Sequence, residues 1–386
     1  MNVYLGMFII AEIFAFMSYY LKGNEVNRNV ILFQNKKIRI NQRGIWCVWL
    51  SLLSFLPFFL VASLRYNVGT DYIVYSRLQI PQVMDGIYKK VEFLYRYVIK
   101  IGMSFGDKQW VFVITHFIIL LFLFLHVKRY SKDFRWSIFV FMFGAFFNVS
   151  LNIMRQFIAI SIFVYATKYI CKREFWKYEF WIMIAVLFHK TALIYIPIYF
   201  LPRLKIKKWI YPCIVLFCAV FSKTIRRGII WLTSVFGVYE SYFNSQFDTN
   251  NLQWDFFAFN TIVLLIIFYV EYSNENYSWS KVRQNLTLRE SESEEKNYEY
   301  FIFQMQIATT LVSVLSAIIP NSTRIIFMFS IFQITYIPII IRKISKKYDY
   351  ILVTISFWVL YIITFYRLVV VRNIGETLIY QSIFSK

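Results

Sequence analysis

A short segment after an early apolar run has residue types that could bind phosphate and move a proton. It contains Arg65, Gly69 and Asp71, followed closely by Tyr72 and Tyr75. The planar guanidinium of an arginine suits a phosphate, and a carboxylate can accept a proton from a sugar hydroxyl. The two tyrosine rings could stack on sugar faces. The alternative is an arginine that reaches the lipid headgroups from a helix end, with an aspartate in an ordinary turn.

Two further segments interrupt apolar sequence with polar residues. Asn152, Arg155 and Gln156 lie between two apolar runs, and His189 lies where two short apolar runs meet. A lone arginine between apolar helices is costly unless it meets a partner, and a pyrophosphate would be such a partner. The histidine could hydrogen-bond a phosphate or carry a proton near neutral pH. Contact with lipid headgroups for Arg155, and a satisfied polar group for His189, are the alternatives.

The fourth candidate is Arg324, which follows a short polar turn at 320–323 and opens the next apolar run. Its alternative is again an arginine at a helix start that reaches the headgroups. His116 and His126 lie inside one apolar run, and we interpret both as structural. The sequence has no DxD or HExxH motif and no cluster of histidines at ligand spacing. We therefore expect no metal site and no cofactor.

The composition shows what kind of protein must position these residues. Of 386 residues, 59% are apolar and 16% are charged, whereas a soluble domain has about 25% charged residues. The net charge is +21, but the basic residues lie between apolar runs and form no patch. This distribution argues against a nucleic-acid partner and predicts a chain that contacts membrane lipid.

The apolar runs predict an all-α polytopic membrane protein with a single transmembrane domain over 1–386. A spanning helix needs about 20 mostly apolar residues. About twelve runs (10–14) approach this length: 3–21, 45–64, 110–127, 136–151, 156–171, 178–188, 191–201, 209–221, 256–272, 301–319, 325–341 and 350–366.

The basic residues between the runs predict the topology. Lys and Arg concentrate in cytoplasmic loops, and they are more frequent in the inner loops if the N-terminus lies outside. This arrangement makes 65–109 an outer loop with an amphipathic segment, 222–255 an outer loop or re-entrant segment, and 273–300 a cytoplasmic loop. It also brings five polar residues toward the outer face: Arg65, Asp71, Arg155, His189 and Arg324.

The same segments resemble the EpsG-like branch of bacterial polysaccharide polymerases, related in role to the O-antigen polymerases called Wzy. The resemblance rests on LRYNVGTDYIVYSRL at 64–78, LNIMRQFIAISIFVYA at 151–166 and FHKTALIYIPIYFL at 188–201, with a weaker match in RIIFMF at 324–329. The motifs occur in this order between residues 64 and 329.

The resemblance implies a fold similar to the multi-helix (GT-C-like) glycosyltransferases that use lipid-linked sugar donors. It implies a metal-independent polymerase that joins oligosaccharide repeat units carried on undecaprenyl pyrophosphate, at the outer face of the bacterial cytoplasmic membrane. A chain-length regulator protein is a further expected partner. Two other functions stay open: a flippase for lipid-linked oligosaccharides, and a lipid-dependent ligase or acyltransferase.

The resemblance and the residue chemistry together give two sets of expected site residues. We expect the catalytic residues to be Arg65, Asp71, Arg155 and His189. We expect the substrate-binding residues to be Gly69, Tyr72, Tyr75, Asn152, Gln156 and Arg324.

Overall fold

The structure is a computed structural model, and it describes residues 1–23, 42–88, 91–203, 210–236, 251–273 and 293–385, together with 243, 245 and 248. The described chain is helical, apart from turns and an isolated antiparallel bridge between Arg65 and Ser382. The predicted all-α class is therefore confirmed. The chain divides into two compact units: unit 1 comprises Met1–Phe157, Ile337–Ile339 and Phe365–Lys386, and unit 2 comprises Ile158–Tyr336 and Ile340–Thr364.

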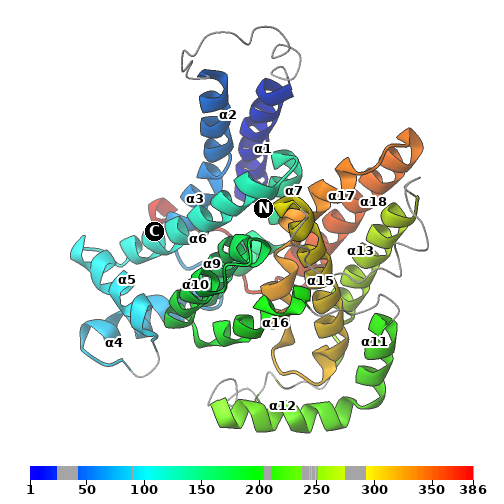
Figure 1. The fold of residues 1–386 in the computed structure, drawn as a ribbon. Coiled ribbons are helices and arrows are strands. Elements are labelled where there is room, and N and C mark those ends of the chain that lie inside the picture. The colour runs from blue at the N-terminus through cyan, green and yellow to red at the C-terminus, as the bar shows by residue number, and fades with distance from the viewer. Residues whose placement is uncertain are drawn as a thin grey trace. The chain divides into compact units, whose positions relative to one another are not determined.

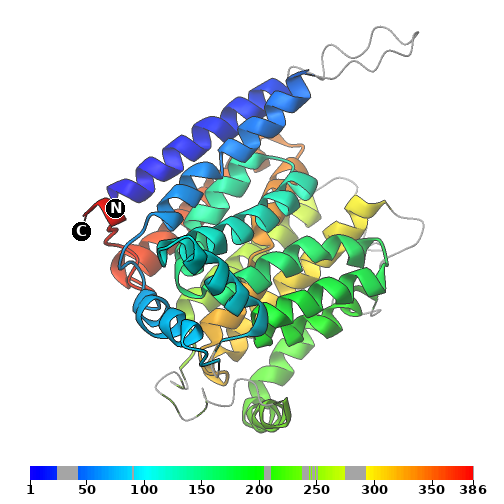
Figure 2. The ribbon, with the colours of Figure 1, turned by 90° about the vertical axis from the view of Figure 1, so that its left-hand side faces the viewer.

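Unit 1 is organised around its first helix. The first two helices form a long side-by-side hairpin (Figures 1 and 2), and the first helix also packs against the third and seventh. The elements of this unit are α1 (Asn2–Gly23), α2 (Gln42–Leu53), α3 (Leu56–Ser63), η1 (Val74–Gln79), α4 (Ile80–Met84), α5 (Phe93–Ser104), α6 (Gln109–Tyr130), α7 (Phe134–Phe143), α8 (Phe146–Asn152), the start of α9 (Met154–Cys171), η6 (Tyr366–Val371) and η7 (Ile383–Ser385).

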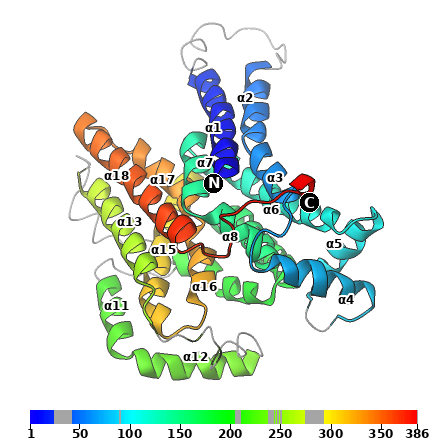
Figure 3. The same cartoon turned by 180° about the vertical axis from the view of Figure 1, so that it is seen from behind.

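Both ends of the described chain belong to unit 1, where the C-terminal segment passes the start of α1 (Figure 3). The hydroxyl of Tyr4 donates to the carbonyl of Thr377 over 2.5 Å, and its ring lies 5.9 Å from that of Tyr380. Because Tyr4 is at the start of α1, the C-terminal segment is fixed at the same end of the unit as the N-terminus.

Unit 2 is organised around α15, which packs against α11, α13 and α16. Figure 1 shows α11 and α12 meeting at a large angle. The elements are the rest of α9, α10 (Phe175–Phe188), η2 (Lys190–Tyr199), η3 (Leu201–Arg203), α11 (Ile210–Val220), α12 (Ser222–Phe236), α13 (Trp254–Ser273), α15 (Glu294–Val314), η5 (Leu315–Ala317), α16 (Ser322–Ser330), α17 (Gln333–Arg342) and α18 (Lys347–Phe365).

A buried network of amide side chains joins four helices of unit 2. Gln333 donates from Nε2 to Oδ1 of Asn260 over 3.0 Å and to Oε1 of Gln306 over 2.9 Å. Its own Oε1 accepts from the Tyr361 hydroxyl over 2.9 Å. Such bonds hold helices together where lipid offers no hydrogen-bonding partner. We interpret this network as structural.

Fewer helices than predicted meet the length and composition of a membrane span. Among the described residues there are six such helices, or up to eight if the bent pairs α7–α8 and α16–α17 each count as one span. The predicted runs at 156–171, 178–188, 191–201 and 209–221 form α9, α10, η2 and α11, none of which counts among these spans. In α9, Ile158, Phe163 and Ile170 are fully buried. The run of α9 is therefore apolar because it packs against protein, which gives the same sequence signal as contact with lipid. The elements α10, η2 and α11 have 14, 10 and 11 residues, fewer than the roughly 20 that a span needs.

The three predicted loops contain structure of their own where they are described. The segment at 65–109, predicted as an outer loop, contains η1, α4 and α5. Helix α5 exposes Phe93, Tyr97 and Ile101 and buries Tyr95 and Ile99. The segment at 222–255 opens with α12. Most of the predicted cytoplasmic loop at 273–300 lies outside the described residues, and its last part begins α15.

Candidate functional site

The loop between α3 and η1, the Arg65 loop, is held in place by Arg65, whose side chain has no exposed surface. Its guanidinium donates to the carbonyl of Leu151, to the carbonyl of Val68 over 3.4 Å and to the sulfur of Met154 over 3.1 Å. The ring of Phe112 lies 5.2 Å from its Cζ. Arg65 thus ties the loop to the point where α8 ends and α9 begins.

Arg65 carries a buried charge without a carboxylate partner in the described part of the chain. Burial lowers the pKa of its guanidinium to about 10. The side chain is still protonated at neutral pH, so this region carries a fixed positive charge in a medium that screens poorly. Its Nε is buried and has no hydrogen-bond partner in the structure.

Asn152 organises the rest of the loop from the end of α8. Its Oδ1 accepts from the Thr70 hydroxyl over 3.1 Å and from the backbone N–H of Asp71 over 3.3 Å. Gly69 has a φ of +97°, and a Cβ there would lie 2.6 Å from Oδ1 of Asn152. Gly375 has a φ of +75°, and a Cβ there would lie 2.2 Å from Nδ2 of the same residue. Both glycines are therefore needed for the close approach as well as for the backbone conformation.

The C-terminal segment lies beside this loop. Three backbone hydrogen bonds join the two segments. The N–H of Tyr66 donates to the carbonyl of Gln381 over 2.8 Å, that of Gly69 to Glu376 over 3.2 Å, and that of Thr70 to Gly375 over 3.0 Å. Further along, Nδ2 of Asn148 donates to Oγ1 of the fully buried Thr377 over 2.9 Å. This segment is not among the predicted site residues. The signal that could have indicated it is Gly375, a glycine in the polar stretch that follows the apolar run at 350–366.

Arg155 lies in the first turn of α9 and forms an ion pair with Glu92. The side chains of Arg155 and Glu92 are 15% and 12% exposed. The ring centroid of Tyr75 lies 6.0 Å from Cζ of Arg155. Burial raises the pKa of Tyr75, so its hydroxyl stays protonated across the physiological range. Glu92 is a second residue that the sequence analysis did not include in the site.

The two tyrosines that were expected to stack on sugars are buried. Tyr72 is 3% exposed and Tyr75 is 4% exposed. The ring of Tyr72 stacks on Phe112, with centroids 4.9 Å apart and planes 10° apart. This arrangement leaves little ring surface for a ligand and indicates that both rings support the loop.

The structure places eight of the ten predicted site residues in unit 1 and two in unit 2. The eight are Arg65, Gly69, Asp71, Tyr72, Tyr75, Asn152, Arg155 and Gln156. Gln156 is 3% exposed. His189 lies between α10 and η2, where a break was predicted, and Arg324 lies in the first turn of α16. No group of three or more metal-ligating side chains is present in the described ranges.

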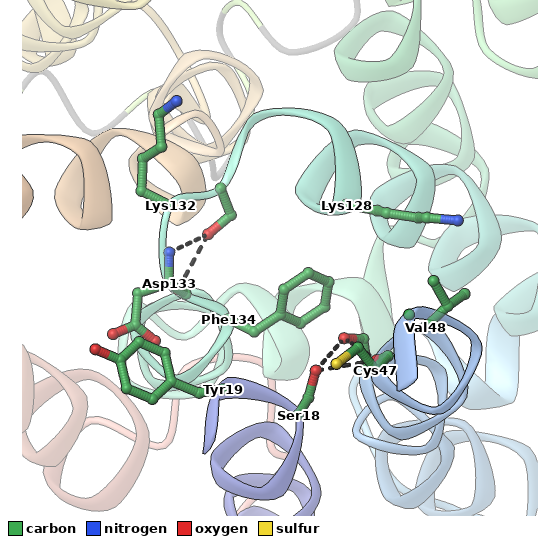
Figure 4. A pocket seen from close by; sticks show the side chains of 11 residues that line it. Ser18, Tyr19, Cys47, Val48, Lys128, Lys132, Asp133 and Phe134 are labelled. Atoms are coloured by element: carbon green, nitrogen blue, oxygen red, sulfur yellow. Dashed lines mark hydrogen bonds between the residues drawn. The ribbon is translucent and has the colours of Figure 1, made fainter. Parts of the chain in front are cut away.

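The end of unit 1 that lies away from the Arg65 loop contains a pocket. Gln109 donates to the carbonyl of Arg65 over 3.1 Å at the start of α6, and Lys128 lies about 30 Å further along the same helix. A pocket of about 270 Å³ lies there (Figure 4), and the hydroxyls of Ser18 and Ser51 are 2.8 Å apart within it. Its lining residues are Ser18, Tyr19, Gly44, Cys47, Val48, Ser51, Lys128, Ser131, Lys132, Asp133 and Phe134. The length of α6 matches the thickness of a hydrocarbon core, so the Arg65 loop and this pocket occupy opposite ends of a span.

One of three comparisons with known proteins gives a match. The EpsG family model matches residues 48–382, a range that includes the Arg65 loop, Glu92, Arg155 and Gly375. No curated protein and no solved structure matches the chain. Because the matched range covers most of the sequence, this multi-pass membrane protein belongs to the EpsG family, a family linked to exopolysaccharide biosynthesis.

Proposed function

We propose that this protein is a polysaccharide polymerase that joins oligosaccharide repeat units carried on undecaprenyl pyrophosphate. The observation that carries the proposal is Arg155, a partly buried arginine at the start of α9, beside a loop organised by Asn152 and close to Glu92 and Tyr75. Membership of a family linked to exopolysaccharide biosynthesis supports the substrate class.

In the proposed reaction, a sugar hydroxyl of one repeat unit attacks the anomeric carbon of another. The bond from that carbon to the pyrophosphate oxygen breaks, the electron pair leaves with the lipid pyrophosphate, and the hydroxyl proton passes to a carboxylate. Asp71 is the proposed base, because Asn152 fixes its backbone. Arg155 is the proposed electrophilic group, because its planar fork can stabilise the charge that develops on the leaving pyrophosphate.

Arg65 has a different proposed role. Its complete burial excludes direct contact with a substrate in this conformation, and its bonds to Leu151 and Val68 join the loop to α8. We therefore assign Arg65 to positioning, together with Asn152, Gly69 and the two buried tyrosines. The proposal for unit 1 does not depend on His189 or Arg324, which lie in unit 2.

The proposal includes three features that the resemblance implies: a multi-helix glycosyltransferase architecture, a site at the outer face of the cytoplasmic membrane, and a chain-length regulator as partner. It also includes about twelve spans, which the apolar runs predict. The structure supports the first of these features only in outline, since six described helices meet the length and composition of a membrane span.

A flippase is the main competing function, and it would need a polar path through the membrane. The buried amides of unit 2 bond to one another, so they favour helix packing over a path. The test is to incubate the purified protein with a synthetic lipid-linked repeat unit and to look for a ladder of products on a gel. A ladder supports the polymerase, and its absence with active control enzyme would reject it. In a deletion strain, a lost polymerase leaves single exported units, whereas a lost flippase leaves none outside.

A further inference from the structure

The ion pair between Arg155 and Glu92 has an unusual feature on the glutamate side. Glu92 occupies the N-cap position directly before α5, where a short polar side chain such as Ser, Asp or Asn would accept a hydrogen bond from the first turn of the helix. Its side chain makes no such bond. The carboxylate instead reaches Nη1 of Arg155, which comes from a distant part of the sequence. Glu92 thus leaves the first turn of α5 uncapped and binds the arginine.

The backbone around Glu92 is held in place without its side chain. Arg96 donates from Nε to the carbonyl of Val91 over 2.6 Å and from Nη2 to that of Tyr88 over 3.1 Å. The N–H of Arg96 also donates to the carbonyl of Glu92 over 3.2 Å. Because these bonds fix the turn, the Glu92 side chain can change partner while α5 stays in place.

We propose that Glu92 is a positioning residue that neutralises Arg155 before substrate binds and exchanges with the pyrophosphate group of the lipid carrier. The inference rests on the proposed function, since it names the same anionic ligand. An arginine that is 15% exposed needs a counter-ion, because an unpaired charge with so little water around it is strongly unfavourable. A pyrophosphate carries more charge than a carboxylate and offers several oxygens to the guanidinium fork, so it can replace Glu92.

The exchange also gives Glu92 a part in turnover. After the transfer, the lipid pyrophosphate must leave Arg155, and the returning carboxylate competes with it for the same guanidinium. A chain without this carboxylate should hold pyrophosphate more tightly and release it more slowly. Glu92→Gln should therefore lower both KM and kcat, a pattern that a general loss of structure would not produce.

The first experiment titrates the purified full chain in detergent with inorganic pyrophosphate, by calorimetry. We expect Glu92→Gln to bind about tenfold more tightly than the wild type, a change of about 1.4 kcal/mol, and Glu92→Asp to bind like the wild type. Glu174→Gln is the matched control, since it removes a carboxylate from an exposed pair with Lys177 in unit 2. Equal or weaker binding by a folded Glu92→Gln variant would overturn the exchange.

A second experiment needs no variant and covers the case in which Glu92→Gln fails to fold. Wild-type protein is treated with a water-soluble carbodiimide and an amine, with and without pyrophosphate, and Glu92 labelling is measured by mass spectrometry. Exchange predicts more labelling with pyrophosphate, and unchanged or reduced labelling would overturn it. The two proposals can fail separately. Tighter pyrophosphate binding by Glu92→Gln without any polymer ladder would reject the polymerase and support the exchange. A ladder without tighter binding would support the polymerase and reject the exchange.

Discussion

Asn152 and Gly375 approach each other so closely that any side chain at position 375 would have to displace the Asn152 amide. A Cβ there would lie 2.2 Å from Nδ2 of Asn152, and the backbone φ of +75° is one that residues with a side chain rarely adopt. The C-terminal segment therefore packs against the side-chain amide of Asn152. The oxygen of this amide accepts hydrogen bonds from the Thr70 hydroxyl and the Asp71 N–H. The last residues of the described chain are therefore part of the candidate site.

Gly375→Ala should displace Asn152 and remove most polymer formation. Gly86→Ala is the matched control, because Gly86 has a φ of +79° with nothing within 4 Å of its Cβ position. The free energy of unfolding of Gly86→Ala should fall by about 1–2 kcal/mol because of the backbone conformation alone. That of Gly375→Ala should fall by about 1–3 kcal/mol more, because the new Cβ overlaps Asn152. Thermal unfolding in detergent and the product ladder measure the two effects. Equal stability and full activity in both variants would show that the Asn152 contact is unimportant.

Thr377→Val should destabilise the protein without altering its shape. The threonine is fully buried, and its Oγ1 accepts from Nδ2 of Asn148 over 2.9 Å. The valine would leave that amide without its partner, at a cost of about 1–3 kcal/mol. Thr233→Val, on an exposed part of α12, should change the unfolding midpoint little. A Thr377→Val protein as stable as the control would mean that the C-terminal segment is not held as described.

The two ends of α6 should be accessible from opposite sides of the membrane. Phe105 and Lys128 are exposed near the start and the end of this span. In a cysteine-free background, Phe105→Cys should react with an impermeant maleimide in intact spheroplasts, and Lys128→Cys only after permeabilisation. Tags at the two termini should both report outside. The reverse pattern at these two cysteines would place the Arg65 loop in the cytoplasm and reject an outer-face polymerase.

Polymer formation should not require a divalent cation, because the Arg155 guanidinium supplies the positive charge that stabilises the leaving pyrophosphate. Ladder synthesis by purified protein should be unchanged in EDTA. If chelation stops synthesis and added magnesium or manganese restores it, the arginine-based mechanism is wrong.

The sequence predicted the parts of the site that lie within a few residues of one another. Arg65, Gly69 and Asp71 share one loop, and Arg155 stands out as a charge between apolar runs. The partnership of Glu92 with Arg155 and of Gly375 with Asn152 could not be predicted, because no local pattern indicates which distant segment packs against a loop. The apolar runs also outnumber the six to eight helices that meet the span criteria in the described chain, in part for a related reason. Residues such as Ile158 and Phe163 are apolar because they are buried, and an apolar run does not distinguish protein from lipid as its surroundings.

The most direct test of the central claim is the polymer ladder made by Arg155→Lys at matched expression. Lysine keeps the charge but lacks the two-pronged geometry, so the loss should approach that of one transition-state contact, about 3 kcal/mol or roughly a hundredfold in rate. Arg135→Lys is the control, because Arg135 forms a two-pronged pair with Asp133 at the other end of unit 1, and it should retain long polymer. Our account predicts that Arg155→Lys reaches the membrane in normal amount but makes almost no long chains, whereas wild-type chain lengths would contradict it.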